Sequence, residues 1–504
     1  MKFLSCSTAW HDILAPTMER PKKPISITIF GATGDLSERK LIPALFSLYC
    51  QNLLPKQFRL VGFSRGELSD EEFQKFVTNS LRKKGHFVYE KEVEQFVKNA
   101  LYVEGRFEDA DSYQKLYAKL KELDNTVYKT CSNKMFHLAV PPVFYENIFP
   151  LLKKSGLTDD CGQKKDIQHD WTRVIVEKPF GRDIQTAQNL DMLLGKLFKE
   201  SQIFRIDHYL GKETLRNILA FRFSNTLFEP IWNKDHIEKV EIRLHERLGI
   251  EGRGALYDNI GAMRDVGQNH VLQMLAAVAM ENPCGVTGSN IREERAKIIS
   301  ELKPFGPAAI KKDVIRGQYK GYRKEKDVDP KSQTETYFRM TTYIDNERWR
   351  GVPFHLSSGK KMRERNADIT IHFKPTRSCL FLPEDNGQHL CNILRFRIQP
   401  KEAISLRFWA KKPGFQNKVI QKKLTFRYRE SQDFSKIPDA YAILLYDCII
   451  GDQTMFMSTR EIEASWNYVT PILDQWQKVP LQIYAQHTDG PGKQITNKQM
   501  PNNK

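Results

Sequence analysis

The hydrophobic pattern changes part-way along the chain. Up to about Ile206, short continuous apolar runs of strand length alternate with stretches of helical periodicity. The runs are Ile25–Phe30, Phe58–Phe63, Met135–Val140 and Arg173–Glu177. Apolar runs of this kind between helices predict βαβ units around a parallel sheet that is buried on both faces.

Beyond Ile206 the strand-like segments are longer, and they alternate polar with apolar residues. They are Val240–Gly249, Ala367–Phe373 and Ile393–Pro400. This alternation predicts a half-solvated antiparallel sheet, with helices such as Val266–Met280 between its strands. We therefore predict an α/β N-terminal domain, Rossmann-like and doubly wound. An α+β C-terminal domain with a large, mainly antiparallel sheet is predicted to follow it.

The same patterns set the predicted domain boundaries. We expect an irregular N-terminal arm over 1–24, the α/β domain over 25–206, the α+β domain over 207–486 and a polar, disordered tail over 487–504. In the α/β domain, apolar residues from Leu41 to Tyr49 share one helical face. Pro43 lies inside that segment, so it should kink the helix or place the regular part later.

Composition narrows the compartment and the class of protein. No apolar run approaches the ~20 residues needed to span a bilayer, and the first residues lack the ~7–15-residue apolar stretch of a secretory signal. The eight cysteines are scattered without Cys-x-x-Cys spacing. Reduced thiols, no structural zinc and a cytoplasmic location are therefore predicted.

The formal net charge of +17 favours anionic partners, which include nucleic acid, a membrane surface and phosphorylated small molecules. The Lys and Arg residues are spread along the chain, and no block reaches five or six like charges. A dispersed basic surface is usually a solvated surface, so we predict no nucleic-acid and no membrane partner. A nucleic-acid-binding protein remains an alternative that rests on charge alone.

A glycine turn follows the first predicted strand and opens a helix. Its residues are Gly31, Ala32, Thr33, Gly34, Asp35 and Leu36. Small residues at a helix N-terminus let the backbone approach a pyrophosphate, whose charge the free N–H groups and the helix dipole favour. Because the spacing is Gly-x-x-Gly, a plain strand-to-helix turn stays open as the alternative.

The end of the second strand bears on which dinucleotide would bind there. NAD-specific proteins place an acidic residue at this point to hold the ribose hydroxyl. Here the strand runs into Ser64-Arg65, and an arginine there can pair with the 2′-phosphate of NADP, with Thr33 as a further donor. An ordinary solvated arginine is the alternative, and Glu67 lies close by.

The segment Arg205–Glu213 brings a carboxylate, an imidazole, a phenol and an ammonium together, in Asp207, His208, Tyr209 and Lys212. If a helix starts here, His208 and Lys212 lie one turn apart on the same face, where they could grip a phosphate dianion with Tyr209. A capped helix start with a surface lysine is the alternative.

A second cluster, Arg264–His270, opens the predicted helix Val266–Met280. His270 shares a helical face with Val266, Met274 and Ala277, so it should point to the interior. It is either a satisfied core histidine or a shielded imidazole that acts as a general base near neutral pH once a carboxylate orients it.

Together these segments resemble the glucose-6-phosphate dehydrogenase family in its bacterial form. The resemblance extends from about Ile25 to about Gln486. Its matching motifs include ITIFGATGDL, LVGFSR, HLAVPPVFYE, VIVEKPFG, RIDHYLGKE, RDVGQNH, GVPFHLSSGK and RIQP. The resemblance implies oxidation of glucose 6-phosphate to 6-phosphoglucono-1,5-lactone with hydride transfer to NADP, the first step of the oxidative pentose phosphate pathway. It also implies a homodimer or homotetramer and no metal.

The resemblance also implies residue roles. His270 would be the catalytic base and Asp207 the carboxylate that orients it. His208, Tyr209, Lys212 and Lys360 would hold the substrate phosphate, and Glu246 and Asp265 would accept sugar hydroxyls. Gln399, Arg365 and Lys178 would also lie at the substrate pocket. A cis Pro179 would follow Lys178. The cofactor site would comprise Gly31, Ala32, Thr33, Gly34, Asp35, Leu36, Arg65, Tyr145 and Lys178.

Three positions depart from the family's usual residues. Glu38 replaces a basic residue near the glycine turn, where it would weaken attraction for a phosphate unless it points to solvent. Ser357 stands where many members have arginine. Ser405 stands where animal members have a tyrosine of a second, structural NADP site, so no such site is predicted. A dinucleotide-sensing protein without chemistry is a further hypothesis, which the presence of both Asp207 and His270 disfavours.

Overall fold

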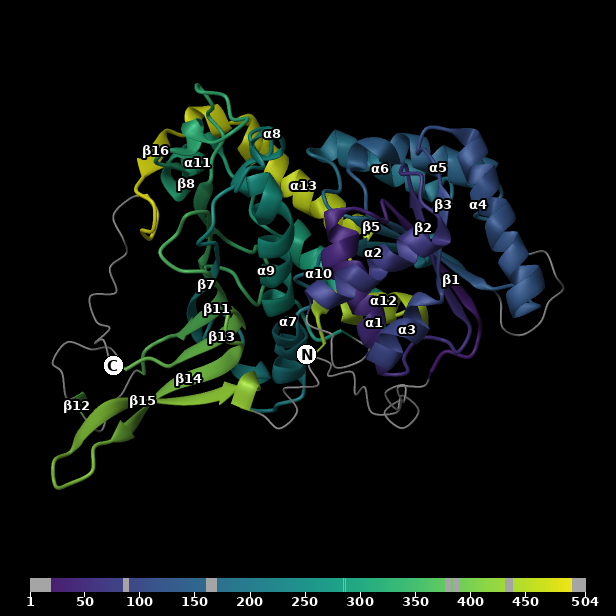
Figure 1. Ribbon diagram of the computed structural model, residues 1–504. Coiled ribbons are helices and arrows are strands. Elements are labelled where there is room, and N and C mark those ends of the chain that lie inside the picture. The colour runs from purple at the N-terminus through teal and green to yellow at the C-terminus, as the bar shows by residue number, and fades with distance from the viewer. Residues whose placement is uncertain are drawn as a thin grey trace. The chain divides into compact units, whose positions relative to one another are not determined.

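A computed structural model describes residues 20–84, 90–159, 170–283, 285, 287–376, 382–383, 390–430 and 438–491. The chain divides into two compact units (Figure 1). The first comprises Met1–Lys178, Met192–Ile206 and Tyr441–Gln453, and the second comprises Pro179–Asp191, Asp207–Ala440 and Thr454–Lys504. Most of the predicted arm 1–24 and of the predicted tail 487–504 lies outside the described residues.

The first unit contains a six-stranded sheet whose pairings are all parallel, in the order β3-β2-β1-β4-β5-β6. Its strands are β1 (Ile25–Phe30), β2 (Phe58–Ser64), β3 (Ala100–Glu104), β4 (Asn133–Leu138), β5 (Thr172–Glu177) and β6 (Ile203–Ile206). This strand order is that of a doubly wound dinucleotide-binding fold, in which ligands bind where the order reverses, at the carboxyl ends of the strands. The predicted Rossmann-like fold is confirmed.

Helices connect these strands. They are α1 (Ile42–Cys50), α2 (Asp70–Lys83), α3 (Glu90–Val97), α4 (Ala110–Leu123), α5 (Tyr145–Lys154) and α6 (Ile184–Gly195), with α12 (Ala440–Ile450) joining from late in the chain. Pro43 lies in the first turn of α1, where its missing N–H has no partner to lose. A π-helical turn, Ser37–Leu41, precedes α1. The prediction that the regular helix begins later is therefore confirmed.

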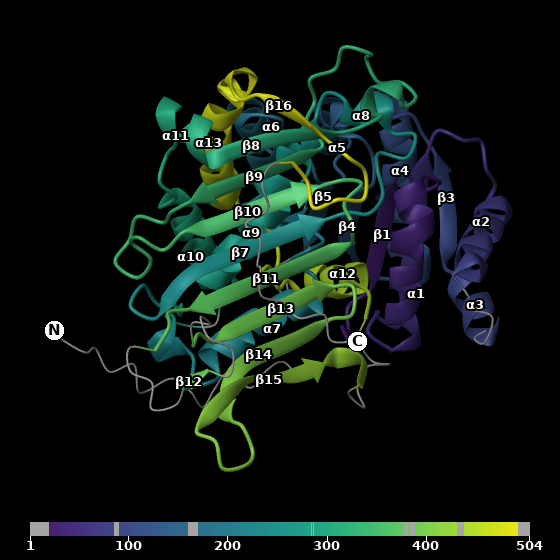
Figure 2. The same cartoon turned by 90° about the vertical axis from the view of Figure 1, so that its left-hand side faces the viewer.

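The second unit is built on a ten-stranded mixed sheet, which Figure 2 shows face-on. Its order is β12-β15-β14-β13-β11-β7-β10-β9-β8-β16. The strands are β7 (Ile237–His245), β8 (Val314–Tyr319), β9 (Tyr337–Thr342), β10 (Phe354–Gly359), β11 (Asn366–Phe373), β12 (Leu382–Pro383), β13 (Ile393–Gln399), β14 (Ala403–Lys411), β15 (Lys418–Arg427) and β16 (Leu481–Tyr484). Six pairings are antiparallel and three parallel, which confirms the predicted large, mainly antiparallel sheet.

Helices lie along one face of this sheet (Figures 1 and 2). The unit contains α7 (Glu213–Phe223), α8 (Gly254–Tyr257), α9 (Leu272–Ala279), α10 (Gly288–Ser300), α11 (Pro307–Asp313) and α13 (Thr459–Asp474). A π-helical stretch, Met263–Val271, runs directly into α9. Val266, His270, Met274 and Ala277 are buried as predicted, but α9 is buried on every side.

Two further observations bear on the sequence predictions. Cys50, Cys391 and Cys448 are free, whereas Cys131 is disulfide-bonded. The prediction of reduced thiols is therefore wrong for Cys131, because pairing depends on three-dimensional proximity that cysteine spacing alone does not reveal. No helix in the described part of the chain is long and apolar enough to cross a membrane.

Candidate active site

A buried aspartate–histidine pair lies in the second unit. Asp207 and His270 are 1% and 2% exposed. Nδ1 of His270 lies 2.5 Å from Oδ1 of Asp207. Burial alone would raise the pKa of Asp207, but the charge and hydrogen bond of His270, with a smaller contribution from His208, lower it to about 2. Asp207 is thus ionised at neutral pH, and its bond to Nδ1 leaves Nε2 of His270 as the nitrogen that can accept a proton.

The segment around Asp207 forms a turn rather than the start of a helix. Oδ1 of Asp207 accepts the backbone N–H of Tyr209 at 2.9 Å, and α7 begins only at Glu213, with Lys212 as its N-cap. The helix start that the sequence left open at this segment is not found before Glu213, because an aspartate side chain that accepts the backbone N–H two residues later favours a turn.

This turn nevertheless gathers the predicted groups. The ring centroids of His208 and Tyr209 lie 4.7 and 4.4 Å from that of His270. Lys212 is half-buried at the end of the turn. Asp207, His208 and His270 each offer a ligand atom within 4.8 Å of the others, so this cluster is also the place to test for a metal ion.

The helix that carries His270 is anchored at its start by a buried glutamate. Oε1 of Glu335 accepts the N–H of Met263 at 3.0 Å, and Oε2 accepts Nε1–H of Trp476 at 2.8 Å. Burial raises the pKa of Glu335, and the backbone hydrogen bond opposes that rise. A carboxylate at a helix N-terminus satisfies free N–H groups and complements the helix dipole. The stretch it caps is π-helical, a form often found at functional sites.

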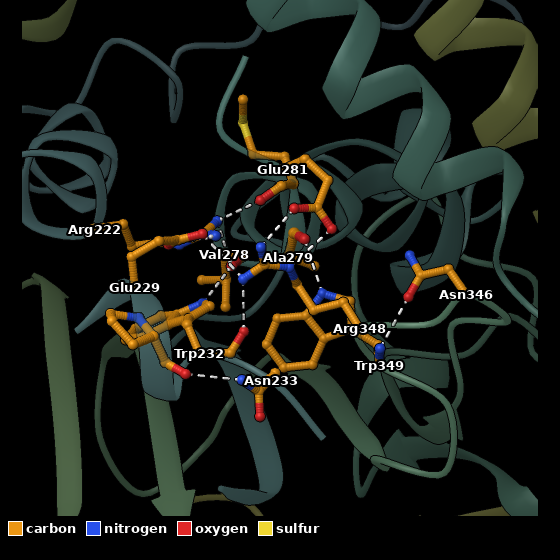
Figure 3. A network of polar contacts seen from close by, with 12 residues as sticks. Arg222, Glu229, Trp232, Asn233, Val278, Ala279, Glu281, Asn346, Arg348 and Trp349 are labelled. Carbon is orange, nitrogen blue, oxygen red and sulfur yellow. Dashed lines mark hydrogen bonds and ion pairs between the residues drawn. The ribbon is translucent and has the colours of Figure 1, made fainter. Parts of the chain in front are cut away.

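The other end of the same helix is held by a network of polar contacts (Figure 3). Nη1 of the fully buried Arg222 donates to the carbonyls of Val278 and Met280, at 2.8 and 2.7 Å. The indoles of Trp232 and Trp349 donate to Val278 and Ala279, both at 2.8 Å. Carboxylates of Glu229 and Glu281 and the guanidinium of Arg348 surround Arg222. Carbonyls that a helix end leaves without partners are thus satisfied by side chains.

Lys360 lies among acidic groups. Its Nζ contacts Oε2 of Glu246 and lies 3.4 Å from Oδ2 of Asp265 and 5.0 Å from the ring centroid of Tyr257. Lys360 is 4% exposed. The structure therefore brings Lys360 together with the two predicted hydroxyl acceptors, and its charge is compensated by them.

A hydrogen-bonded chain leads from Tyr209 to the surface of the unit. Nε2 of Gln399 donates to the hydroxyl of Tyr209 at 2.6 Å, and Nη2 of Arg365 donates to Oε1 of Gln399 at 3.2 Å. Burial raises the pKa of Tyr209, and nearby Glu246, Asp207 and Asp265 raise it further while Arg365 lowers it. Because one phenol is influenced by all these groups, the predicted substrate residues of this unit lie around a single place.

The departure at Ser357 also has a partner in this unit. The Ser357 hydroxyl and Nε2 of His245 lie 3.1 Å apart on neighbouring strands, so the serine is part of the sheet's own hydrogen bonding.

The glycine turn of the first unit lies at the carboxyl end of β1. Gly31 has φ +78°, and a Cβ there would lie 2.6 Å from the carbonyl oxygen of Ala139, so glycine is required. Gly34 N–H donates to Gly31 O at 2.9 Å, and Glu38 N–H donates to Gly34 O at 3.0 Å, which places the turn directly at a helix N-terminus. Glu38 forms an ion pair with Lys83 of α2, so its charge next to the turn is compensated.

Arg65 lies beside this turn, immediately after β2. Its side chain is exposed. The hydroxyls of Ser64 and Thr33 lie 3.2 Å apart and join the end of β2 to the glycine turn. An exposed guanidinium next to a glycine turn at a helix N-terminus fits a dinucleotide that carries a further phosphate.

Tyr145 and Lys178 belong to the same unit. Tyr145 is 1% exposed, and its hydroxyl donates to the carbonyl of Glu177 at 3.2 Å. The Glu177 carboxylate lies 3.1 Å from Nε2 of His137 and accepts the hydroxyl of Tyr441 at 3.4 Å. Lys178 therefore follows a firmly held residue.

The predicted cis bond at Pro179 is wrong. In the described part of the chain the cis peptide bond is Gln399–Pro400. An X–Pro bond prefers trans only weakly, so the tertiary surroundings decide its isomer.

Several residues that support the site were missed from the sequence. Glu335, Trp476 and Arg222 hold the ends of the helix that carries His270, and Tyr257 packs against Lys360. Glu335 and Trp476 are far from the site motifs in the chain, and the local patterns around all four residues single none of them out for this role. Arg222 gave one weak signal, since an arginine among the apolar residues of Leu215–Phe223 needs a buried partner.

Comparison with known proteins decides the family. The profile for "Glucose-6-phosphate dehydrogenase, NAD binding domain" matches residues 28–217, and that for "Glucose-6-phosphate dehydrogenase, C-terminal domain" matches residues 219–501. This chain belongs to the glucose-6-phosphate dehydrogenase family. It is an oxidoreductase with an NAD(P)-binding domain.

Relatives of this glucose-6-phosphate dehydrogenase family member come from bacteria and plants. Glucose-6-phosphate 1-dehydrogenase of Aggregatibacter actinomycetemcomitans is 42% identical over 462 residues, which cover 89% of this chain and 90% of the relative. That of Chlamydia muridarum is 39% identical over 475 residues, covering 90% and 91%. "Glucose-6-phosphate 1-dehydrogenase 6, cytoplasmic" of Arabidopsis thaliana is 38% identical over 463 residues, covering 90% and 86%.

Solved structures of the glucose-6-phosphate dehydrogenase family agree with the fold. "Glucose-6-phosphate dehydrogenase in complex with its substrate glucose-6-phosphate" has a TM-score of 0.85 and 34% identity over 94% of this chain and 96% of that one. The enzyme from Mycobacterium avium has a TM-score of 0.78 and 29% identity over the same shares.

Proposed function

We propose that this chain oxidises glucose 6-phosphate to 6-phosphoglucono-1,5-lactone with NADP as hydride acceptor, the first step of the oxidative pentose phosphate pathway. The observation that carries the proposal is the buried Asp207–His270 pair in a member of this family. Loss of hydride from the anomeric carbon requires the proton of its hydroxyl to leave as the carbonyl forms. A positioned imidazole performs that proton transfer without a metal.

His270 is the general base of the proposed reaction. With Nδ1–H directed to Asp207, its Nε2 takes the proton of the anomeric hydroxyl and becomes positively charged. The ionised Asp207 stabilises that charge and holds the ring in one orientation and one tautomer. Bound NADP supplies the hydride acceptor, and the residues that would hold it are those of the Gly31–Leu36 turn with Arg65, Tyr145 and Lys178.

The rest of the site binds the sugar phosphate. His208, Tyr209 and Lys212 hold the phosphate from the turn 207–212, with Arg365 and Gln399 behind the phenol. Glu246 and Asp265 accept sugar hydroxyls, and Lys360 keeps both carboxylates in place. Phosphate binding at a distance from the reacting carbon supplies binding energy that orients the substrate.

The proposal is tested by measuring absorbance at ~340 nm, where reduced nicotinamide absorbs, with glucose 6-phosphate and with NADP and NAD in separate assays. Reduced nicotinamide forms only if the substrate is oxidised, the step in which His270 is the proposed general base. Reduction of NADP is expected, and it should almost disappear in His270→Asn. Folded protein that reduces neither cofactor would overturn the proposal. Reduction of NAD in preference to NADP would overturn the cofactor assignment and point to Glu67 as a ribose ligand.

The proposal includes the compartment and assembly. We expect a cytoplasmic protein. The name of the Arabidopsis relative describes that relative as cytoplasmic. We expect a homodimer or homotetramer formed through the ten-stranded sheet, on which Leu424 and Phe426 of β15 are 61% and 50% exposed. Sedimentation velocity would measure the assembly, and a monomer at assay concentration would contradict it.

A further inference from the structure

The loop that carries Arg65 is attached to a tyrosine from the neighbouring strand. Tyr102 lies on β3, which pairs with β2. Its hydroxyl lies 3.0 Å from the carbonyl oxygen of Ser64 and 2.7 Å from that of Gly66. Both carbonyls therefore contact one hydroxyl, and Arg65 is the single residue between them.

The tyrosine itself is firmly placed. It is 8% exposed, its ring centroid lies 5.3 Å from that of Phe73, and its backbone N–H donates to Oδ1 of Asp70 at 2.6 Å. Burial raises the pKa of Tyr102 to about 12, although hydrogen bonding opposes the rise. The phenol is therefore protonated at every assay pH, and its one O–H is shared between, or alternates between, two carbonyl acceptors.

Within the described ranges of the chain, this loop has few other attachments. Ser64 O also accepts the N–H of Gly105 at 3.0 Å, so the strand side of the loop has a second hydrogen bond. Gly66 and Glu67 are exposed, and Gly66 has no side chain to limit its backbone. The Tyr102 hydroxyl is thus the contact that restrains the side of the loop that follows Arg65.

We propose that Tyr102 is a positioning residue for cofactor selectivity, because its hydroxyl fixes the backbone on both sides of Arg65 and so aims the guanidinium at the 2′-phosphate of NADP. This inference rests on the proposed function, which assigns Arg65 to that phosphate. A guanidinium–phosphate contact depends on direction, since two parallel N–H groups must meet two oxygens. NAD lacks the 2′-phosphate, so its binding does not depend on where Arg65 points.

Tyr102→Phe tests the inference, because it removes the hydroxyl and keeps the ring on Phe73. The ratio of kcat/KM for NADP to kcat/KM for NAD is expected to fall about twofold to tenfold, the equivalent of one ordinary hydrogen bond. The fall should come from KM for NADP. The KM for glucose 6-phosphate should stay unchanged.

Tyr113→Phe is the matched control. Tyr113 is a fully buried tyrosine of the same unit whose hydroxyl donates to the carbonyl of Phe107 at 3.0 Å rather than to a carbonyl beside Arg65. Both variants lose one buried hydrogen bond, so their thermal stabilities should fall to a similar extent. Only Tyr102→Phe should change the selectivity ratio, and an equal change in both variants would show a merely structural role and overturn the inference.

Arg65→Met separates this inference from the proposed function. If Arg65→Met leaves the NADP preference intact, the assignment of Arg65 fails and the inference fails with it. If Arg65→Met lowers the preference but Tyr102→Phe does not, the inference alone is wrong. In the double variant, Tyr102→Phe should have no further effect on the ratio, since there is no guanidinium left to aim.

Discussion

Replacing Asp207 by asparagine removes a charge from the pair while keeping the shape of the side chain. In the native protein the pKa of Asp207 falls from 3.8 to about 2, chiefly through His270, although burial acts in the opposite direction. Nearly two pK units correspond to roughly 2–3 kcal/mol. By linkage, the charged form of His270 is stabilised by a similar amount, so its loss should lower kcat/KM at neutral pH roughly 30–150-fold.

The pH profile carries the specific prediction. Without the aspartate charge the imidazole holds a proton less strongly, so the acidic limb of kcat/KM in Asp207→Asn should move to lower pH. The assay is the initial rate of NADPH formation between about pH 5 and 9 with both substrates varied. The plateau should also fall, because a weaker base removes the hydroxyl proton more slowly.

Asp265→Asn is the matched control for this experiment. Asp265 lies on the same π-helical stretch as His270, and its Oδ2 lies 3.4 Å from Nζ of Lys360. It should raise KM for glucose 6-phosphate and leave the acidic limb in place. If Asp207→Asn keeps the native acidic limb and the native plateau, the conclusion that Asp207 supports His270 as the general base is refuted.

Four further predictions concern the substrate phosphate, the contacts of Arg222, acid stability and metal removal. Lys212→Ala should raise KM for glucose 6-phosphate while changing kcat little, and an unchanged KM would count against the phosphate contact. Arg222→Met removes two hydrogen bonds to the carbonyls of Val278 and Met280 and the ion pair with Glu229, so urea unfolding should show a loss of about 3–5 kcal/mol. The lowered pKa of Asp207 contributes stability above about pH 4, and this contribution is lost as the pH falls towards 2. The stability of Asp207→Asn, measured by acid unfolding, should lack this part of the pH dependence. Activity should survive EDTA, and a loss restored by added metal would identify the Asp207–His208–His270 cluster as a metal site.

The strands were the most predictable part of the fold. Ile25–Phe30 was predicted and found with the same bounds, and Arg173–Glu177 differs by one residue. Both runs are continuous and apolar because the parallel sheet buries both faces, so burial and sequence pattern coincide. Three strands of the second sheet were also predicted from their alternation, among them β13, whose residues alternate between buried and half-buried.

Sequence patterns predict local structure poorly where a side chain forms hydrogen bonds that compete with those of a helix. A helix start near Asp207 was one possibility, but its carboxylate accepts the N–H of Tyr209 and a turn results. The motif itself predicted the right cluster, because short spacing keeps Asp207, His208, Tyr209 and Lys212 together in either conformation. The 63-residue separation of Asp207 and His270, in contrast, was bridged only by the family resemblance.

The supporting residues were beyond prediction from one sequence. Glu335 reaches Met263, at the start of the helix that carries His270, from the segment before β9, 72 residues later in the chain. Tyr102 reaches the Arg65 loop across a strand pairing that periodicity does not specify. Such contacts depend on the register of two elements, and a one-residue slip would point each side chain away.

The helix Ala440–Ile450 makes the first unit depend on a late part of the chain. Nη1 of Arg173 donates to the carbonyls of Cys448 and Ile449, and Gln453 donates to the carbonyl of Ile203. During synthesis, Ile206 leaves the ribosome roughly 235 residues before Tyr441, an interval of about 10–50 s at ordinary elongation rates. Throughout that time all six strands of the parallel sheet have been synthesised, but the carbonyls that accept hydrogen bonds from Arg173 have not. The nascent first unit is therefore a natural client for chaperones, and a fragment that ends at Ile206 should express as an incompletely packed protein.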